Sequence, residues 1–431
     1  MADIQPAYTK LPNELWDLIF SYGFVRKDFL VLSTVNRAFN RAVEPSLYSS
    51  FTWIPNPSVG LPVWSSLNNH DIRPYTRSRR RNRMELPDGY FTQQNPYLLL
   101  RSILKSPRRA GYIKKVRLLA PSSDFGIFWD SYQARECGLS TAQFEICKRT
   151  IEALPSSLHS YWLDGLYKGK LDVIMGILLL RLTGLTSIEI RLRDASTIGS
   201  TVIDALVSPM ANRPHHYRYP HIKSLSVTCC SPGTFWHGKL SPTTNLRKLV
   251  LRNGLINEHI LTTFLSSTPH LEDLNCELVY DNGAQQYLNC NALKSALLLI
   301  QSTLKRLVLD IQVLSGHEWN PIPWDIQHSM GSLKGFQKLR YLDIPMKLYV
   351  KEIYHASEAA SLMPFAEREV DYWSLFLPDG LEFFGVRPNS PWALDYRHET
   401  EAVRCMDVYF RMNPGVKRIF PVPVTGDDDE E

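Results

Sequence analysis

The amino-acid sequence predicts a mixed α/β protein, in which a short helical N-terminal unit precedes a long array of stacked strand–helix units. Apolar residues follow helical spacing within the first fifty residues. After residue 96, one strand pattern recurs many times, and helical patterns lie between its copies. A two-domain α/β protein with βαβ crossovers is the competing fold class, because it alternates strands and helices in the same way.

The first helix is expected to begin at Leu11. Its apolar positions follow the helical period at Leu11, Leu15, Leu18, Ile19 and Tyr22. Pro12 fits the first turn, and Gly23 ends the helix. Asp28 is expected to cap a second helix over 29–35, and Asn36 a third that stops at Pro45. Three such helices are too small to bury much apolar surface alone.

The residues of this segment also match a family motif. They are Leu11-Pro12-x-Glu14-Leu15, Ile19-Phe20-x-Tyr22, Asp28-Phe29, Leu32-Ser33-x-Val35-Asn36-Arg37-x-Phe39-Asn40 and Pro45-x-Leu47-Tyr48. The segment resembles an F-box, and its ending looks most like F-box proteins of filamentous fungi. It departs from the family at Gly23-Phe24, where a leucine usually follows the tyrosine. The alternative is a generic helical cap over the rest of the protein.

The resemblance implies a partner, a Skp-type adaptor that joins the F-box to a cullin scaffold. The expected adaptor-binding residues are Leu11, Pro12, Leu15, Ile19, Leu30, Val35 and Phe39. Leu30 belongs to this set because it is apolar in a segment too small to bury it.

Residues 53–96 read as a Pro/Arg-rich linker, since prolines and glycines break every periodic pattern there. Six arginines lie between Arg73 and Arg83. A nuclear-import signal or an RNA- or phosphate-binding patch is one interpretation, and a solvated loop between domains is the preferred one. We therefore divide the chain into an F-box domain at 8–52, the linker, a repeat domain at 97–424 and an acidic tail at 425–431.

The repeat consists of an apolar residue, two variable residues, an apolar residue, one variable residue and a third apolar residue. Strong copies are Ile113-Val116-Leu118, Leu185-Ile188-Ile190, Ile222-Leu225-Val227, Leu246-Leu249-Leu251, Leu304-Leu307-Leu309 and Leu339-Leu342-Ile344. Weaker copies are Leu158-Tyr161-Leu163, Leu271-Leu274-Cys276, Leu381-Phe384-Val386 and Val416-Ile419. Helical patterns lie at 97–104, 142–154, 171–182, 256–265, 292–300 and 356–376.

No single unit can bury both of its faces, so neighbouring units must stack into a solenoid. This part resembles the irregular leucine-rich-repeat horseshoe that is fused to many F-boxes. It lacks the regular Asn or Cys ladder that follows each strand in that family. The number of units and the lack of a Gly-rich phosphate loop favour the solenoid over the two-domain alternative.

Composition excludes several classes of protein. The chain has 431 residues, 11% of them aromatic, and 48 Lys and Arg oppose 43 Asp and Glu. The aromatic content excludes wholesale disorder, and the net charge of +5 argues against a nucleic-acid partner. The N-terminus shows no secretory pattern, and no apolar run approaches the ~20 residues of a membrane span. We expect reduced cysteines, no membrane partner, and a location in the cytoplasm, the nucleus or both.

No motif for catalysis or metal binding stands out. The sequence contains no GxSxG, P-loop or HExxH, and the His215-His216, His221, Cys229-Cys230 and His237 cluster has spacing that suits zinc poorly. We expect no catalytic residue, no metal and no cofactor. An α/β hydrolase or transferase remains an alternative without a nucleophile elbow to support it.

The variable strand positions of a horseshoe line its concave face. The candidate client-binding residues there are Arg117, Trp162, Arg191, Lys248, Arg252, Asp273, Glu277, Asp310 and Asp343. Mixed charges with aromatic residues suit protein recognition better than phosphate tracking. The basic residues fall in the earlier copies and the acidic residues in the later ones, which would orient an extended client.

These features predict a non-catalytic adaptor. We expect the substrate-recognition subunit of a Skp–cullin–F-box ubiquitin ligase, with an unknown protein client on the repeat domain. The alternative is an F-box protein that acts as a binding or scaffold module outside ubiquitylation.

Overall fold

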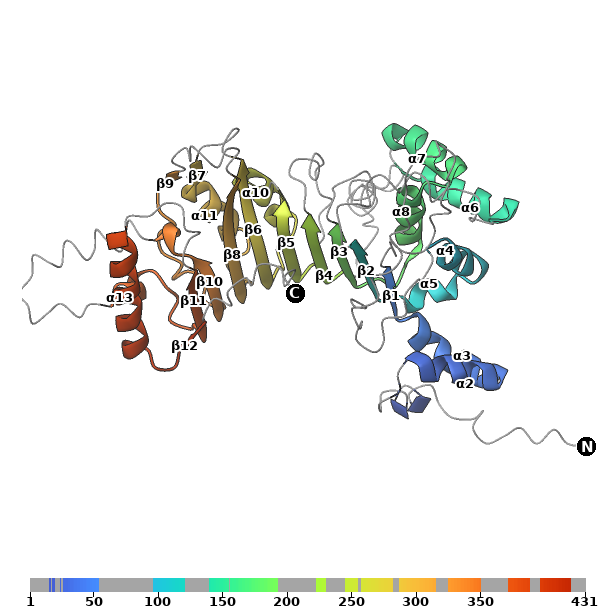
Figure 1. Ribbon diagram of the computed structural model, residues 1–431, viewed down its shortest axis with the longest axis horizontal. Helices are drawn as coiled ribbons and strands as arrows, with labels where there is room; N and C mark the ends of the chain where they lie inside the picture. Colours follow the sequence, from blue (N-terminus) through green and yellow to red (C-terminus); the bar gives the residue numbers. More distant parts are fainter. Residues whose placement is uncertain are drawn as a thin grey trace, which may run out of the picture.

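A ten-stranded parallel sheet forms the body of the molecule in the computed structural model (Figure 1). The structure describes residues 15–16, 18–19, 24, 26–53, 96–120, 139–154, 156–192, 222–229, 245–254, 257–281, 287–314, 325–349, 371–387 and 396–419. The strands of the sheet are β1 (Ser50–Trp53), β2 (Lys115–Ala120), β3 (Ser187–Leu192), β4 (Ser224–Cys229), β5 (Lys248–Gly254), β6 (Asp273–Asp281), β8 (Arg306–Leu314), β10 (Tyr341–Pro345), β11 (Phe383–Arg387) and β12 (Lys417–Arg418).

The strands follow one another across the sheet in chain order, from β1 at one edge to β12 at the other. A doubly wound sheet reverses its order part of the way across. Two short strands, β7 (Tyr287–Asn289) and β9 (Asp325–Gln327), pair separately. The mixed α/β class predicted from the sequence is therefore confirmed, and its sheet is parallel throughout.

Hydrogen bonds align the starts of the strands along one edge of the sheet. The carbonyl oxygen of Lys114, just before β2, accepts from the N–H groups of Thr186 and Ser187 at 2.8 and 3.0 Å. The carbonyl of Glu272, before β6, accepts from Lys305 and Arg306 at the same two distances. This arrangement fixes the register of each strand on the previous one.

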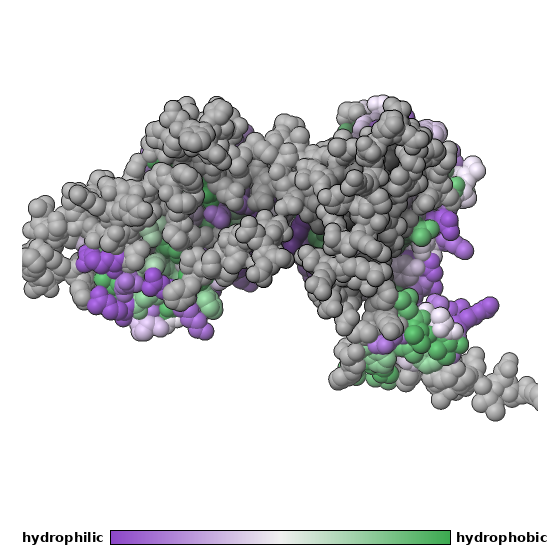
Figure 2. All heavy atoms as spheres, viewed as in Figure 1, coloured by the Kyte–Doolittle hydropathy of each residue, from purple (hydrophilic) through white to green (hydrophobic). Residues whose placement is uncertain are grey.

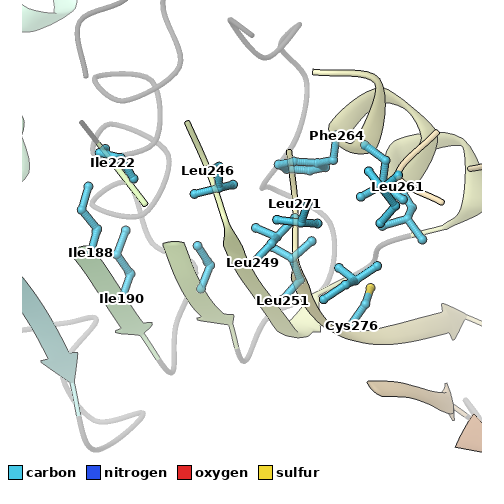
Figure 3. Close-up of a cluster of buried hydrophobic side chains, with 14 of the residues drawn as sticks. Ile188, Ile190, Ile222, Leu246, Leu249, Leu251, Leu261, Phe264, Leu271 and Cys276 are labelled. Atoms are coloured by element: carbon cyan, nitrogen blue, oxygen red, sulfur yellow. The ribbon is translucent and has the colours of Figure 1, made fainter. Parts of the chain in front are cut away.

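The three apolar positions of the repeat form the core beneath the sheet. Leu246, Leu249 and Leu251 are at most 2% exposed, and the equivalent residues of neighbouring strands lie beside them (Figure 3). Leu261 and Phe264 of α10 (Glu258–Ser266) pack against them. Burying one such side chain contributes roughly 1.5–3 kcal/mol, so stacked units stabilise each other.

Helices supply the rest of this core. They are α4 (Pro96–Lys105), α5 (Arg108–Tyr112), α6 (Thr141–Glu152), α7 (Ser156–Lys168), α8 (Leu171–Arg181), α10, α11 (Cys290–Leu298) and α13 (Tyr396–Met412). Short 3₁₀ turns lie at Met346–Leu348 and Trp373–Leu375. No helix in the described ranges has the length and apolar character needed to cross a membrane.

One copy of the repeat was wrongly predicted to form a strand. Leu158-Tyr161-Leu163 lies in α7 and forms no strand. Leu158, Trp162 and Leu166 recur every four residues, which is the helical period, and Trp162 is fully buried. A Cβ at Gly176 of α8 would clash with the indole of Trp162, so the glycine allows this close approach.

The sequence also missed β1, whose two buried residues, Phe51 and Trp53, are too few to give a periodic signal. β1 pairs with β2 and straddles the expected boundary between residues 52 and 53. Of the predicted helix at 356–376, only 371–376 is described, and it contains the 3₁₀ turn. The linker from 54 to 95, the acidic tail and most of the histidine cluster lie outside the described residues.

Two details of the N-terminal helices also differ from expectation. Asp28 lies in the first turn of α2 (Arg26–Val35) and does not precede it. Asn36 does cap α3 (Arg37–Tyr48), and its side chain accepts from the Phe39 N–H at 2.9 Å. α3 continues through Pro45, because Leu47 packs on the helical core and the Tyr48 hydroxyl lies 3.1 Å from the Ser102 hydroxyl.

Candidate functional site

The N-terminal helices carry a concentration of exposed apolar side chains. The set, named here the N-terminal apolar surface, is Leu15, Leu18, Ile19, Phe24, Leu30, Val31 and Val35. These are seven of the fifteen large hydrophobic residues that are exposed in the described part of the chain. Figure 2 shows hydrophobic side chains gathered over this end of the molecule. Monomeric proteins rarely expose apolar groups so densely unless a partner covers them.

The helices cannot bury this surface themselves, because their own core is small. Phe29 and Val43 form it, with Trp16 and Leu32 packed at its margin. Val31 and Val35 lie one helical turn apart on α2 and are 60% and 59% exposed. The apolar surface therefore faces away from the small core.

Four of the predicted adaptor-binding residues are exposed on this surface: Leu15, Ile19, Leu30 and Val35. Phe39 is half-buried, because its ring packs edge-on against Trp16 at 5.5 Å between centroids. Phe39 therefore packs beneath the exposed residues of the N-terminal apolar surface. Leu11 and Pro12 lie outside the described residues.

A buried carboxylate fastens α3 to the rest of the protein. Glu44 is 3% exposed and accepts from Arg108 at 2.6 Å and from Arg109 at 2.7 Å. The Arg109 guanidinium also lies 5.2 Å from the Tyr48 ring centroid. Both arginines belong to α5, so the helix that supports the apolar surface is held directly on the sheet domain.

A second candidate surface is the outer face of strands β2 to β5. Eight basic residues lie on these strands or directly before them: Lys114, Lys115, Arg117, Arg191, Lys223, Arg247, Lys248 and Arg252. Glu189 is the one acidic residue among the described positions of this region, which we name the basic face. Half-buried hydroxyls lie between the cations, at Ser187, Ser224, Ser226 and Thr228.

The register shows how these groups are arranged. Arg191, Thr228 and Arg252 are direct neighbours across β3, β4 and β5. Lys115 and Lys248 likewise flank Ser187 and Ser224 in one row, so about 14 Å separates the two lysine positions at the usual strand spacing. Hydroxyl donors flanked by cations form a surface suited to an extended anionic partner.

Glu189 neutralises only part of this charge. Arg117 donates to it at 2.7 Å, and Arg191 lies 2.9 Å away. Burial alone would raise the pKa of Glu189, but the hydrogen bond from Arg117 and the charges of Arg117, Arg191 and Lys115 outweigh burial and lower that pKa below its ordinary value.

The later strands do not form the open acidic surface that the sequence suggested. Asp273 lies between Lys248, at 3.0 Å, and Arg306, at 3.2 Å. Glu277 and Asp343 are each only 7% exposed. Asp310 is half-buried and accepts from the Ile311 N–H at 2.8 Å. The register sets Asp273 between cations on its two neighbouring strands, which sequence order alone does not reveal.

One predicted client-binding residue, Trp162, does not lie on the outer face of the sheet. It is fully buried in α7 and belongs to the core, because the strand assigned to it is a helix. Arg117, Arg191, Lys248 and Arg252 lie together on the basic face. Within the described ranges, no group of three His, Cys, Asp or Glu side chains is arranged to hold a metal ion.

Comparison with protein-family models and with curated proteins gives no match for this chain.

Proposed function

We propose that this protein is the substrate-recognition subunit of a Skp–cullin–F-box ubiquitin ligase. The N-terminal apolar surface docks a Skp-type adaptor, and the outer face of the sheet binds a protein client. The proposal includes the finer fold, an F-box followed by an irregular leucine-rich-repeat horseshoe. The protein would hold a client lysine near the ubiquitin-charged enzyme, so that the transfer is accelerated by proximity.

The concentration of exposed apolar residues on α2 and its neighbours carries the proposal. Val31 and Val35 lie on one side of α2, and Asn36 caps α3 immediately afterwards. A buried apolar patch is the usual centre of a stable protein interface. The ion pairs of Glu44 then transmit the position of the adaptor to the sheet domain.

The sheet supports the finer fold. Nine copies of the apolar repeat coincide with strands β2 to β6, β8 and β10 to β12, and those strands are added in chain order. In a solenoid each unit contacts chiefly its neighbours, and the chain-order addition of strands supports that arrangement.

The charge of the basic face indicates that the client is acidic. A partner with an extended acidic segment would meet cations from β2 to β5 with hydroxyl donors between them. Such complementarity accelerates encounter and rejects partners of the wrong charge. It also makes association sensitive to salt.

A binding experiment with point variants tests the proposed function. Val31→Asp with Val35→Asp places two charges on the N-terminal apolar surface, and both positions are more than half exposed, so folding should survive. Deleting residues 1–50 is less clean, because it also removes Glu44 and Tyr48 from the sheet domain.

The wild-type protein should co-purify with a recombinant Skp-type adaptor, and the double variant should lose that binding. Leu298→Asp with Leu299→Asp is the matched control, because both leucines are 45% exposed at the end of α11. Equal adaptor binding by the wild type and the α2 variant would refute the docking assignment.

A further inference from the structure

A pocket of about 570 Å³ lies between α4, α5 and the start of α6. Residues of α4 that recur at helical spacing line one side of it: Leu98, Arg101, Ser102 and Lys105. The opposite side of α4 is buried in the core. The pocket is therefore built on the outer face of a firmly packed helix.

The pocket is positively charged. Arg101, Lys105 and Arg109 line it, and none of the lining residues that the structure describes is acidic. Arg101 and Lys105 are exposed, and neither forms an ion pair within the described part of the chain. Arg109 pairs with Glu44, but Arg108 shares that carboxylate, so one negative charge opposes two positive charges.

Polar side chains complete the lining. Arg109 donates to the Ser102 hydroxyl at 2.7 Å, which fixes both side chains at the pocket wall. Ser140 and Gln143 form a capping box at the start of α6 and line the side facing α4. The Gln143 amide donates to the Arg101 carbonyl at 3.2 Å, so the start of α6 is tied to α4. The partial positive charge of that helix end adds to the three cations.

We propose that this pocket binds a compact dianion of the phosphate-monoester class. Arginine recognises such groups with two parallel hydrogen bonds, and lysine adds a point charge. A phosphate group carries about −1.5 to −2 charges at neutral pH, which matches Arg101, Lys105 and the one surplus positive charge of Arg108 and Arg109 over Glu44 better than a single carboxylate does. The site is separate from both surfaces of the proposed function and goes beyond that function.

A bound dianion would also cross-link four helices. The dianion would lie beside the start of α6 and attract Arg101 and Lys105 of α4 and Arg109 of α5. Arg109 would remain paired with Glu44 of α3. Because the ligand binds the folded state, the protein should unfold at a higher temperature when the pocket is filled.

Calorimetric titration of the full-length protein with inorganic phosphate tests the proposal, with sodium acetate of equal ionic strength as the reference. We expect saturable phosphate binding and at least a ~10-fold weaker affinity for Arg101→Gln with Lys105→Gln, since two charged contacts are lost. Arg37→Gln with Arg41→Gln is the matched control, because it removes two exposed cations four residues apart on α3. It should bind phosphate as the wild type does.

Unfolding temperatures measured without ligand show whether the substitutions themselves change the stability of the fold. They should be the same for the wild type and both variants, because all four side chains are exposed. Equal phosphate affinities for the wild type and the α4 variant, or heats no larger than those with acetate, would overturn the proposal.

Two further probes distinguish the sources of the phosphate group. One is a short peptide with a single phosphoserine, and the other is a phosphatidylcholine vesicle containing a phosphatidylinositol phosphate. Binding of either probe that depends on Arg101 and Lys105 supports the site and names its source. Binding of inorganic phosphate alone supports a free-phosphate site.

Discussion

Replacing Glu44 with glutamine should loosen the N-terminal helices from the sheet domain. The carboxylate is 3% exposed and accepts from two arginines, so the variant removes two charge-assisted contacts at once. Breaking a fully buried ion pair costs about 3–5 kcal/mol. Arg108 and Arg109 are 57% and 28% exposed, so water can solvate them after the change, and we expect a smaller loss of about 1–3 kcal/mol.

Hydrogen exchange is the assay that locates this loss. Amide protons of α2 and α3 should exchange faster in Glu44→Gln, whereas those of β6 and β8 should keep the wild-type rate, because the sheet core does not depend on Glu44. Glu145→Gln changes an exposed carboxylate on α6 and serves as the control. Unchanged exchange in α2 and α3, or equal acceleration throughout the chain, would show that Glu44 does not specifically hold these helices on the sheet domain.

Three further outcomes follow from the structure. Trp162→Ala should destabilise the protein by about 3–5 kcal/mol in denaturant unfolding, and a surface-like loss below ~0.5 kcal/mol would contradict its place in the core. The pKa of Glu189 is lowered from its ordinary value of 4.5 in the folded state. Its ion pairs therefore stabilise the folded state fully at pH values above 4.5, and this stabilisation is lost as the pH falls through the folded-state pKa. Arg117→Gln should therefore lower the unfolding temperature at pH 7 more than at pH 3.5, and an equal difference at both pH values would contradict the pairing. Replacing Lys115, Lys223 and Arg252 with glutamine should slow association with a glutamate-rich model peptide in stopped-flow mixing, and added salt should narrow the difference from the wild type. Association that is equally fast at low salt would exclude the basic face as the binding surface.

The strands could be predicted from the sequence because each unit repeats the same burial. Leu246, Leu249 and Leu251 are buried as the pattern requires, and the residues between them lie on the outer face. The pattern failed at 158–163 because the same apolar spacing also fits a helix, and α7 buries Trp162 instead. Local periodicity cannot separate these outcomes when both satisfy it.

The contacts that build the candidate sites could not be predicted in this way. Glu44 meets Arg108 and Arg109 across more than sixty residues of sequence, and Arg117 meets Glu189 across 72. Such pairs depend on register and helix packing, which composition does not encode. Arg117, Arg191, Lys248 and Arg252 of the basic face could be predicted because strand alternation sets their side, whereas the pocket at α4 required three helices to meet.

Hydrogen exchange of the full-length protein, with and without a recombinant Skp-type adaptor, tests whether the N-terminal apolar surface docks that adaptor. We expect slower exchange in α2 and at the start of α3, beneath Leu30, Val31 and Val35, when the adaptor is added. Strands β3 to β6 should exchange at the same rate in both samples. Unchanged exchange in α2 at saturating adaptor, or protection confined to the sheet, would exclude the N-terminal apolar surface as the adaptor site.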